Sequence, residues 1–260
     1  GRQGATHNLH HGTTLHGQQW VDLETGLPIR AREPLTYYHR EGPAGHFFQT
    51  VSSQGGLGRV GLVGLGVGAL AAYAEEGEAY AFFEIDPAVI RIAEDQRYFT
   101  YISAARERGA DVSIELGDAR LALGEVEARS FDLLVLDAFS SDSIPVHLIT
   151  LEAVELYLSR LREGGLLALH ISNRYLDLEP VLAAIAEELG VLGLVSRDMS
   201  IGESESDETG RQRSHWVVLA REAVALRPLR SGSMWTPLEQ VEGRLLWTDD
   251  YSNFLRVLKW

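Results

Sequence analysis

The sequence feature that most constrains the fold is a glycine-rich segment, RVGLVGLGVGALAAYA, at residues 59–74. Its first part is a nearly continuous apolar run, as in a buried strand, and the residues after the glycines favour a helix. Gly64, Gly66 and Ala69 fit the G-x-G-x-x-G/A pattern of a strand-turn-helix unit whose backbone closely approaches a ligand, and Glu84 follows 20 residues after Gly64. The same glycines also suit plain strand-to-helix packing, so residues outside the segment must decide between the two interpretations.

Strands and helices alternate after residue 56. Further strands are predicted at 79–85, 111–117, 131–139, 166–172, 191–198 and 214–220. Helices are predicted at 68–76, 87–99, 145–165 and 178–190. Repeated strand-helix units predict an α/β protein with a mostly parallel, doubly wound sheet. The last two strands have no helix between them, which predicts an antiparallel hairpin at one edge, and we expect the polar segment 199–213 between them to be a mobile loop.

Residues 1–55 have a different pattern, and we expect a small β-hairpin region there, followed by the α/β domain at 56–260. Turn signals separate short alternating pieces, of which HFFQTV at 46–51 is one. His7 and His11, four residues apart, would also suit a metal site. We favour a flexible terminal segment for these histidines and predict no metal.

Charge and composition exclude several classes of protein. The 260 residues include 37 acidic and 23 basic side chains, and the formal net charge of −14 repels nucleic-acid phosphates and attracts cationic substrates. The chain has no cysteine, which excludes disulfides and thiolate chemistry and is consistent with a reducing compartment such as the cytoplasm. No apolar run approaches the ~18 residues of a membrane-spanning helix, so we expect a soluble chain.

Acidic residues follow two successive strands of the predicted sheet. Asp118 comes after the strand at 111–117, where it could accept a hydrogen bond from an adenine amino group, and the backbone amide of Ala119 could reach the ring. Asp137 ends the next strand, and Asp142 follows five residues later. Together with the closing antiparallel hairpin, these residues favour an S-adenosylmethionine site over a nicotinamide dinucleotide site, which stays the second alternative.

Five segments together resemble the spermidine synthase, or polyamine aminopropyltransferase, family. They are EPLTYYH at 33–39, GLGVGALA at 64–71, FFEIDPAVIRIAE at 82–94, ELGDARLAL at 115–123 and the long run at 131–173. The similarity runs from about residue 9 to 195 and is greatest to divergent bacterial members fused to a membrane-spanning module. It implies a Rossmann-like, methyltransferase-type sheet behind an N-terminal β-hairpin region, and a homodimer. Because the chain starts at Gly1 rather than Met, it also implies the soluble part of a longer membrane protein, at the cytoplasmic face of the inner membrane.

Members of this family move the aminopropyl group of decarboxylated S-adenosylmethionine to an amine and release methylthioadenosine, without a metal. The resemblance assigns nucleoside binding to Gly64, Gly66, Gly68, Glu84, Asp118 and Ala119. It assigns catalytic roles to Asp137, which matches the first Asp of the family's D-S-S-D-P stretch, and to Asp142 and Tyr38. An amine with a pKa of about 10.4 is almost entirely protonated at neutral pH, so a carboxylate that takes its proton meets a chemical need.

Three positions depart from the family pattern. Val67 stands where the family has an Asp that contacts the ammonium of the aminopropyl group, and Tyr37-Tyr38 stands where it has Tyr-Gln. The stretch DAFSSDSIP is two residues longer than its counterpart, so Asp142 matches the second Asp only approximately. These changes leave two alternatives open: a lyase that releases methylthioadenosine from S-adenosylmethionine without an amine acceptor, and a noncatalytic nucleoside sensor of a membrane protein.

A further set of residues could line the pocket for a substrate, such as a polyamine. They are Tyr37, His16, Gln19, Asn173, Asp249 and Asp250. Some have an ordinary structural explanation as well: core packing for Tyr37, a helix cap for Asn173, and a turn or cap for the adjacent aspartates, whereas the register of His16 and Gln19 is ambiguous by several residues.

Overall fold

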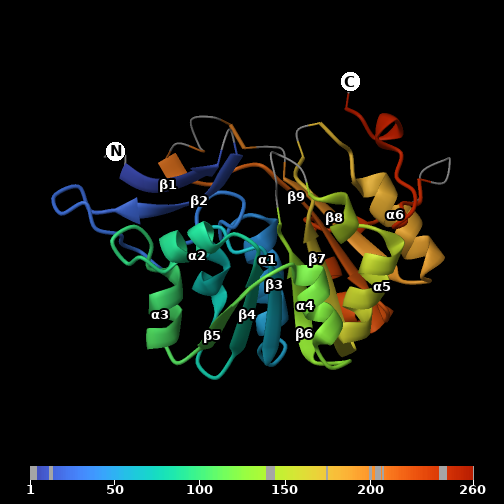
Figure 1. The fold of residues 1–260 in the computed structure, drawn as a ribbon, viewed down its shortest axis with the longest axis horizontal. Helices are drawn as coiled ribbons and strands as arrows, with labels where there is room; N and C mark the ends of the chain where they lie inside the picture. The colour runs from blue at the N-terminus through green and yellow to red at the C-terminus, as the bar shows by residue number, and fades with distance from the viewer. Residues whose placement is uncertain are drawn as a thin grey trace.

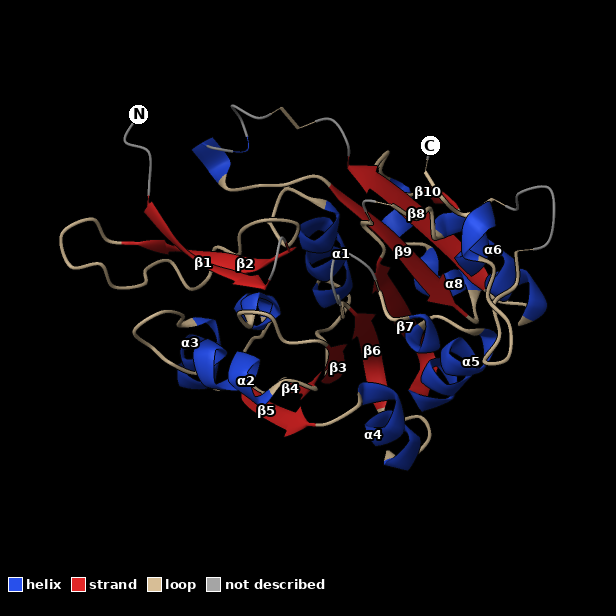
Figure 2. Ribbon diagram, turned by 45° about the horizontal axis from the view of Figure 1, so that its top comes forward, coloured by secondary structure: helices blue, strands red, loops and turns tan. Residues whose placement is uncertain are grey.

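The computed structural model describes residues 5–11, 14–138, 144–173, 175–198, 201–202, 206, 208–239 and 245–259. Its centre is an eight-stranded sheet in the order β10-β8-β9-β7-β6-β3-β4-β5 (Figure 1; β10 is labelled in Figure 2). The strands are β3 (Arg59–Val63), β4 (Ala79–Glu84), β5 (Asp111–Leu116), β6 (Phe131–Leu136), β7 (Leu161–His170), β8 (Leu192–Asp198), β9 (Ser214–Ala220) and β10 (Thr236–Pro237).

Parallel pairing joins β3 to both β4 and β6, β4 to β5, and β6 to β7. Within the described eight-stranded sheet, only β9 and the two-residue β10 run opposite to the other six strands, since β9 pairs antiparallel with both β7 and β8, and β10 pairs antiparallel with β8. The predicted mostly parallel α/β sheet is therefore confirmed. The antiparallel pair β8–β9 is also confirmed, although β10 rather than this pair occupies the outermost position at that edge.

Helices cover both faces of the sheet, which explains the continuous apolar runs of the central strands. The helices that pack on one face are α1 (Pro43–Ser52), α2 (Pro87–Ala93), α3 (Tyr101–Glu107) and α8 (Ala223–Leu226), with a short 3-10 helix at Ala69–Tyr73. The other face carries α4 (Ala119–Glu125), α5 (Leu151–Arg160) and α6 (Glu179–Glu188). Figure 1 shows α4 and α5 in front of β6 and β7. Short 3-10 helices also occur at Val146–Leu148, Leu229–Ser231 and Phe254–Arg256.

A separate antiparallel hairpin, β1 (Ala5–His11) with β2 (Thr14–Val21), precedes the sheet (Figure 2). It packs on the glycine-rich turn after β3: a Cβ atom on Gly17 would overlap the side chain of Val67, which is fully buried. The histidine-rich start is thus part of a strand rather than the flexible segment expected from sequence. The Nδ1 atom of His7 lies 3.0 Å from the carbonyl oxygen of Tyr98.

Several predicted elements differ from the observed ones. Residues 46–51, expected as a strand, belong to helix α1. Pro43 is the first residue of this helix, a position that suits proline. The helix expected at 68–76 is the 3-10 helix Ala69–Tyr73, with Gly68 in the left-handed region as its N-cap. The helix expected at 87–99 ends at Ala93, because Asp95 accepts a hydrogen bond from the backbone N–H of Arg97 and so favours a turn.

The helix predicted at 145–165 occupies only Leu151–Arg160. It begins there because the hydroxyl of Thr150 accepts a hydrogen bond from the N–H of Ala153, and Leu161 already starts β7. Helices α3 and α4 had no sequence prediction. Part of the loop expected at 199–213 lies outside the described residues, and the domain division at residue 55 stays a prediction.

No helix among the described residues combines the length and apolar character needed to cross a bilayer.

Candidate active site

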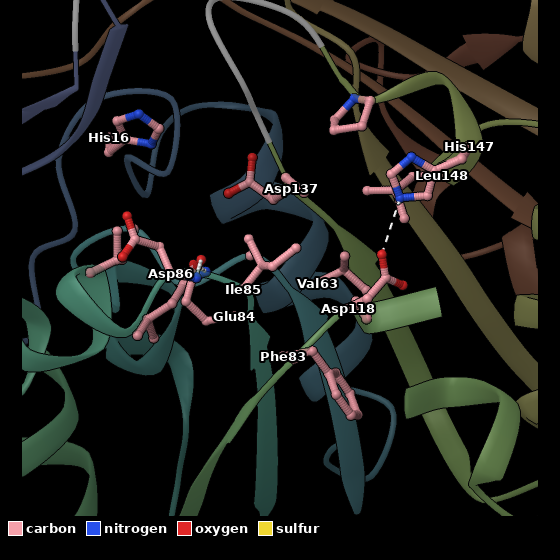
Figure 3. A pocket seen from close by; sticks show the side chains of 18 of the residues that line it. His16, Val63, Phe83, Glu84, Ile85, Asp86, Asp118, Asp137, His147 and Leu148 are labelled. Atoms are coloured by element: carbon pink, nitrogen blue, oxygen red, sulfur yellow. Dashed lines mark hydrogen bonds and ion pairs between the residues drawn. The ribbon is translucent and has the colours of Figure 1, made fainter. Parts of the chain in front are cut away.

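A cavity of about 240 Å³ lies where strands β3 to β6 end at their carboxyl sides. The tip of the hairpin contributes His16, and the segment before α1 contributes Tyr37 and Tyr38. Figure 3 shows the side chains of Glu84, Asp118 and Asp137 around this space, each from the end of a different strand. Parallel strands bring these residues together because their carboxyl ends share one edge of the sheet, as the sequence predicted.

The glycine loop, residues 64–68 after β3, contains three glycines that permit close contacts within the protein. Gly64 has φ +93° and a Cβ atom there would overlap the backbone carbonyl of Asp137. Gly66 has φ +54° and a Cβ atom would lie 2.5 Å from the carbonyl oxygen of His16. Both line the cavity, whereas Gly68 (φ +75°) does not, and a Cβ atom there would lie 2.7 Å from Ile102. Because Gly64 and Gly66 lack side chains, their backbone packs directly against the residue after β6 and against the hairpin at the cavity.

Glu84 lies beside the glycine loop at the end of β4. Its Oε2 accepts the N–H of Leu65 at 3.0 Å and its Oε1 accepts the N–H of Asp86 at 2.9 Å. A carboxylate has about four acceptor positions, so both oxygens keep capacity for ligand hydroxyls. Asp86, which also lines the cavity, caps α2 by accepting the N–H of Ala88 at 2.7 Å.

Asp118 begins helix α4 on the opposite side of the cavity from Glu84 (Figure 3). Its Oδ1 accepts the N–H of Leu121 at 3.0 Å, and its Oδ2 lies 3.3 Å from Nε2 of His147. Ala119 lines the cavity next to it. Neither His147 nor Asp86 was singled out from the sequence, although both lie beside motifs that were.

Asp137 is held by two donors. Tyr38 donates its hydroxyl hydrogen to Oδ2, and Nδ1 of His170 lies 2.7 Å from Oδ1. Burial, and next the charge of Asp137, raise the pKa of Tyr38 well above its ordinary value, so Tyr38 stays a hydrogen-bond donor. His170, the last residue of β7, was not among the site residues predicted from the sequence. Its place at the carboxyl end of a strand was the available signal.

Tyr37 packs against the rings of Tyr38 and His170. Its hydroxyl donates to the carbonyl oxygen of Leu15 at 2.8 Å, and its ring centroid lies 4.5 Å from those of Tyr38 and His170. Burial, followed by the charge of Asp137, raises the pKa of Tyr37 above its ordinary range. Tyr37 thus links the hairpin to the Asp137 pocket as a neutral side chain.

Two further predicted residues, Gln19 and Asn173, do not line the cavity. Gln19 is buried. Its side-chain NH₂ group donates to the hydroxyl oxygen of Thr100 at 2.7 Å, and its side-chain oxygen accepts the backbone N–H of Thr100 at 2.8 Å. Asn173 accepts the N–H groups of Tyr175 and Leu176 at 2.9 and 2.8 Å, as in a turn. Asp142 lies outside the described residues.

Asp249 and Asp250 also lie outside the cavity lining. Both oxygens of Asp249 accept from Arg120, at 2.7 and 2.6 Å, and Oδ1 also accepts the hydroxyl of Thr150 at 2.7 Å. The hydrogen bonds from Arg120 lower the pKa of Asp249 below its ordinary value. Asp250 is exposed in the following turn.

We expect Asp249→Ala to lower the melting temperature by about 2–4 °C while leaving nucleoside affinity unchanged. The side chain ties α4 to α5 through Arg120 and Thr150, but it is partly exposed and so contributes only modestly to stability. Differential scanning calorimetry and a binding titration would measure the two effects. Weaker nucleoside binding at an unchanged melting temperature would contradict this prediction and would indicate that Asp249 contacts the ligand.

The cavity is strongly acidic. Four carboxylates, those of Glu84, Asp86, Asp118 and Asp137, line it, and its described lining includes no lysine or arginine. Such a surface favours a cationic ligand. The described part of the chain contains no cluster of His, Asp or Glu side chains suited to a metal ion.

Comparisons with known proteins agree with this architecture. The chain is 34% identical to a polyamine aminopropyltransferase of Vibrio vulnificus over 99 residues, which is 36% of this chain and 31% of that protein. The similar part thus spans about a third of the relative's length. No protein-family model matches the chain.

Two solved structures show a similar fold. A probable spermidine synthase from Corynebacterium glutamicum superposes with a TM-score of 0.59 over 97% of this chain and 95% of that one, at 15% identity. The spermidine synthase of Thermotoga maritima gives a TM-score of 0.50 over 94% and 80%, at 13% identity. The sequence resemblance to this family is therefore confirmed: the chain has the fold of spermidine synthases and, over 99 residues, a sequence similar to that of a polyamine aminopropyltransferase.

Proposed function

We propose that the chain is an aminopropyltransferase-like enzyme that binds decarboxylated S-adenosylmethionine and transfers its aminopropyl group to an amine, releasing methylthioadenosine. The observation that carries the proposal is Asp137, a carboxylate held by Tyr38 and His170 at the edge of an acidic cavity beside a glycine loop. The proposal extends the likeness to a polyamine aminopropyltransferase, which covers 31% of that relative, to the activity of this chain.

In this proposal the nucleoside lies across the carboxyl ends of β4 and β5. Glu84 accepts hydrogen bonds from the ribose hydroxyls, Asp118 accepts one from the adenine amino group, and the backbone of Gly64 and Gly66, which line the cavity, faces the sulfonium end. Ile85, a residue that is 69% exposed and lines the cavity, offers an apolar surface for the adenine ring.

The acidic lining supports the decarboxylated donor. Decarboxylated S-adenosylmethionine carries a sulfonium and an ammonium, whereas S-adenosylmethionine also carries a carboxylate, for which the described lining supplies no arginine or lysine partner. Val67, at the position where the family has an Asp, is fully buried against the hairpin and does not line the cavity. Other carboxylates of the lining therefore have to receive the ammonium group.

The reaction transfers one proton and breaks one bond. The amine nitrogen attacks the aminopropyl methylene carbon attached to sulfur, a C–N bond forms, and the electron pair of the bond between that carbon and sulfur goes to sulfur, which becomes the neutral thioether of methylthioadenosine. Asp137 accepts the proton that the amine gives up. Because sulfonium is already a good leaving group, positioning and cation recognition are the main tasks of the protein.

Incubation with each sulfonium nucleoside, with and without putrescine, tests the proposal when methylthioadenosine is followed by chromatography. We expect product that depends both on the decarboxylated nucleoside and on the amine. Product without an amine would identify a lyase, and binding without any product would identify a noncatalytic sensor; either outcome contradicts the proposal.

We expect Glu84→Ala to weaken nucleoside binding by about 10- to 100-fold, since hydrogen bonds to a charged group contribute about 1.5–3 kcal/mol. The variant loses the ribose acceptor and also the acceptor for the N–H of Leu65 in the glycine loop. Isothermal titration calorimetry would measure the affinity, with Glu127→Ala as control because Glu127 is exposed and does not line the cavity. Equal affinities of the two variants would remove Glu84 from the nucleoside site.

A further inference from the structure

His170 connects the cavity to the interior of the sheet through a chain of hydrogen bonds. Its Nδ1 lies 2.7 Å from Oδ1 of Asp137, and its Nε2 lies 2.7 Å from the hydroxyl oxygen of Ser172. That hydroxyl oxygen also accepts the backbone N–H of His215 at 2.8 Å. Asp137 lines the cavity, whereas His170 and Ser172 do not, so the chain runs from the cavity into the protein.

The hydrogen bonds favour one tautomer of His170. A carboxylate only accepts hydrogen bonds, so Nδ1 carries a hydrogen that it donates to Asp137. The oxygen of Ser172 already accepts from His215, and its own hydrogen is free to be donated to an unprotonated Nε2. The neutral Nδ1–H form of the imidazole therefore satisfies all of these groups together.

The imidazole ring is also fixed by packing. His170 and Trp216 are register partners of β7 and β9, and their rings stack with centroids 4.6 Å apart and an interplanar angle of 17°. Tyr37 packs against His170 with centroids 4.5 Å apart. The side chain of His170 is 1% exposed and that of Asp137 is 6% exposed, so water has little access to the bond between them.

We infer that His170 is a positioning residue for Asp137, which it holds through Nδ1–H while Ser172 holds the other ring nitrogen. This inference rests on the proposed function, in which Asp137 takes a proton from the attacking amine. Tyr38 holds Oδ2 and His170 holds Oδ1, so together they fix the rotation of the carboxylate and leave lone pairs on a defined side. A carboxylate that could rotate would present the same charge with less accurate geometry, and a misplacement of about 1 Å costs on the order of 10²-fold in rate.

Three variants test the inference. His170→Leu removes the donor and keeps an apolar side chain, and we expect kcat to fall about 10²-fold with the affinity for the nucleoside and the KM for the amine nearly unchanged. His170→Asn places an amide N–H near the position of Nδ1, and we expect it to restore most of kcat. Ser172→Ala leaves the imidazole in place but removes the hydrogen-bond partner of its Nε2, so the ring is held less firmly and we expect a smaller decrease in kcat.

His46→Leu is the matched control, because His46 is a half-buried histidine that accepts a hydrogen bond from Trp235 at 3.1 Å and does not line the cavity. We expect it to lower stability without lowering kcat. If His170→Leu behaves like this control, or if the Asn and Leu variants lose kcat equally, His170 is only a structural residue and the inference is wrong. Should His170→Leu fail to fold, the comparison of Ser172→Ala with wild type decides, and an unchanged kcat contradicts the inference.

Nuclear magnetic resonance provides a measurement that does not depend on turnover. Long-range ¹H–¹⁵N spectra, with His170→Asn used for assignment, should show a protonated Nδ1 and an unprotonated Nε2 for His170. The opposite tautomer would overturn the inference even in an active enzyme. A wild-type protein that forms no product contradicts the proposed function instead, and the spectrum then decides whether His170 donates to Asp137.

Discussion

Asp137→Asn should lower kcat by about 10³-fold and leave nucleoside affinity within a few-fold of the wild type. An amine with a pKa of about 10.4 is unprotonated in only about one molecule in a thousand near pH 7.4. An asparagine amide cannot accept the proton, so the variant must wait for the rare neutral amine. The carboxylate of Asp137 also accepts hydrogen bonds from two donors, Tyr38 and His170, one at each oxygen. An asparagine has one oxygen and one NH₂ group at these positions, so it can accept only one of the two bonds well.

Single-turnover measurements of methylthioadenosine, combined with a separate nucleoside titration, would separate chemistry from binding. Asp132→Asn is a matched control from the opposite end of the same strand. Asp132 accepts the N–H of Arg59 at 2.7 Å and pairs with Arg162 at 2.8 Å, so its loss should reduce stability and leave kcat unchanged. An Asp137→Asn protein with wild-type turnover would remove Asp137 from the mechanism.

Gly64→Ala should be the most damaging change in the glycine loop, with a loss of about 2–5 kcal/mol in the free energy of unfolding and at least about 10²-fold in turnover. The backbone of Gly64 has φ +93°, which an L-residue adopts at a cost, and the new Cβ atom would overlap the backbone carbonyl of Asp137. Relief of this overlap requires either the loop or the end of β6 to move. Either movement displaces Asp137 relative to a bound nucleoside.

Chemical denaturation and steady-state kinetics would measure the two effects of Gly64→Ala. Gly124→Ala serves as its control because Gly124 lies in helix α4 with no atom within 4 Å of an added Cβ. In a helix the change to alanine should stabilise the protein by about 0.5–1 kcal/mol without affecting turnover. A Gly64→Ala protein as stable and active as Gly124→Ala would show that the close approach to Asp137 is not required.

The sequence predicted the arrangement of strand ends well, since this depends on local pattern and on general rules of parallel sheets. Continuous apolar runs define the strands, and residues after parallel strands must meet at one edge. Glu84, Asp118 and Asp137 therefore meet around one cavity in the structure. The roles assigned to them in binding and catalysis stay predictions.

Not every side chain of the N-terminal region could be placed from sequence. Gln19 bonds Thr100, 81 residues later, and is thereby kept out of the cavity, whereas His16 three residues earlier lines it. A shift of one residue in a strand reverses the face of every side chain, and nothing local sets the register of the hairpin against the sheet. Val67 illustrates the same limit, because its burial depends on the approach of Gly17.

By itself, the sequence determined the alternation of strands and helices, the glycine turn after β3 and the edge of the sheet at which acidic residues collect. Only the tertiary structure decided which of those residues acquire partners. Asp137 is joined to Tyr38, 99 residues before it, and to His170, 33 residues after it. Such contacts arise from the packing of the hairpin region and of β7 against β6. The pattern of neighbouring residues along the chain does not encode them in a form that periodicity or a short motif can reveal.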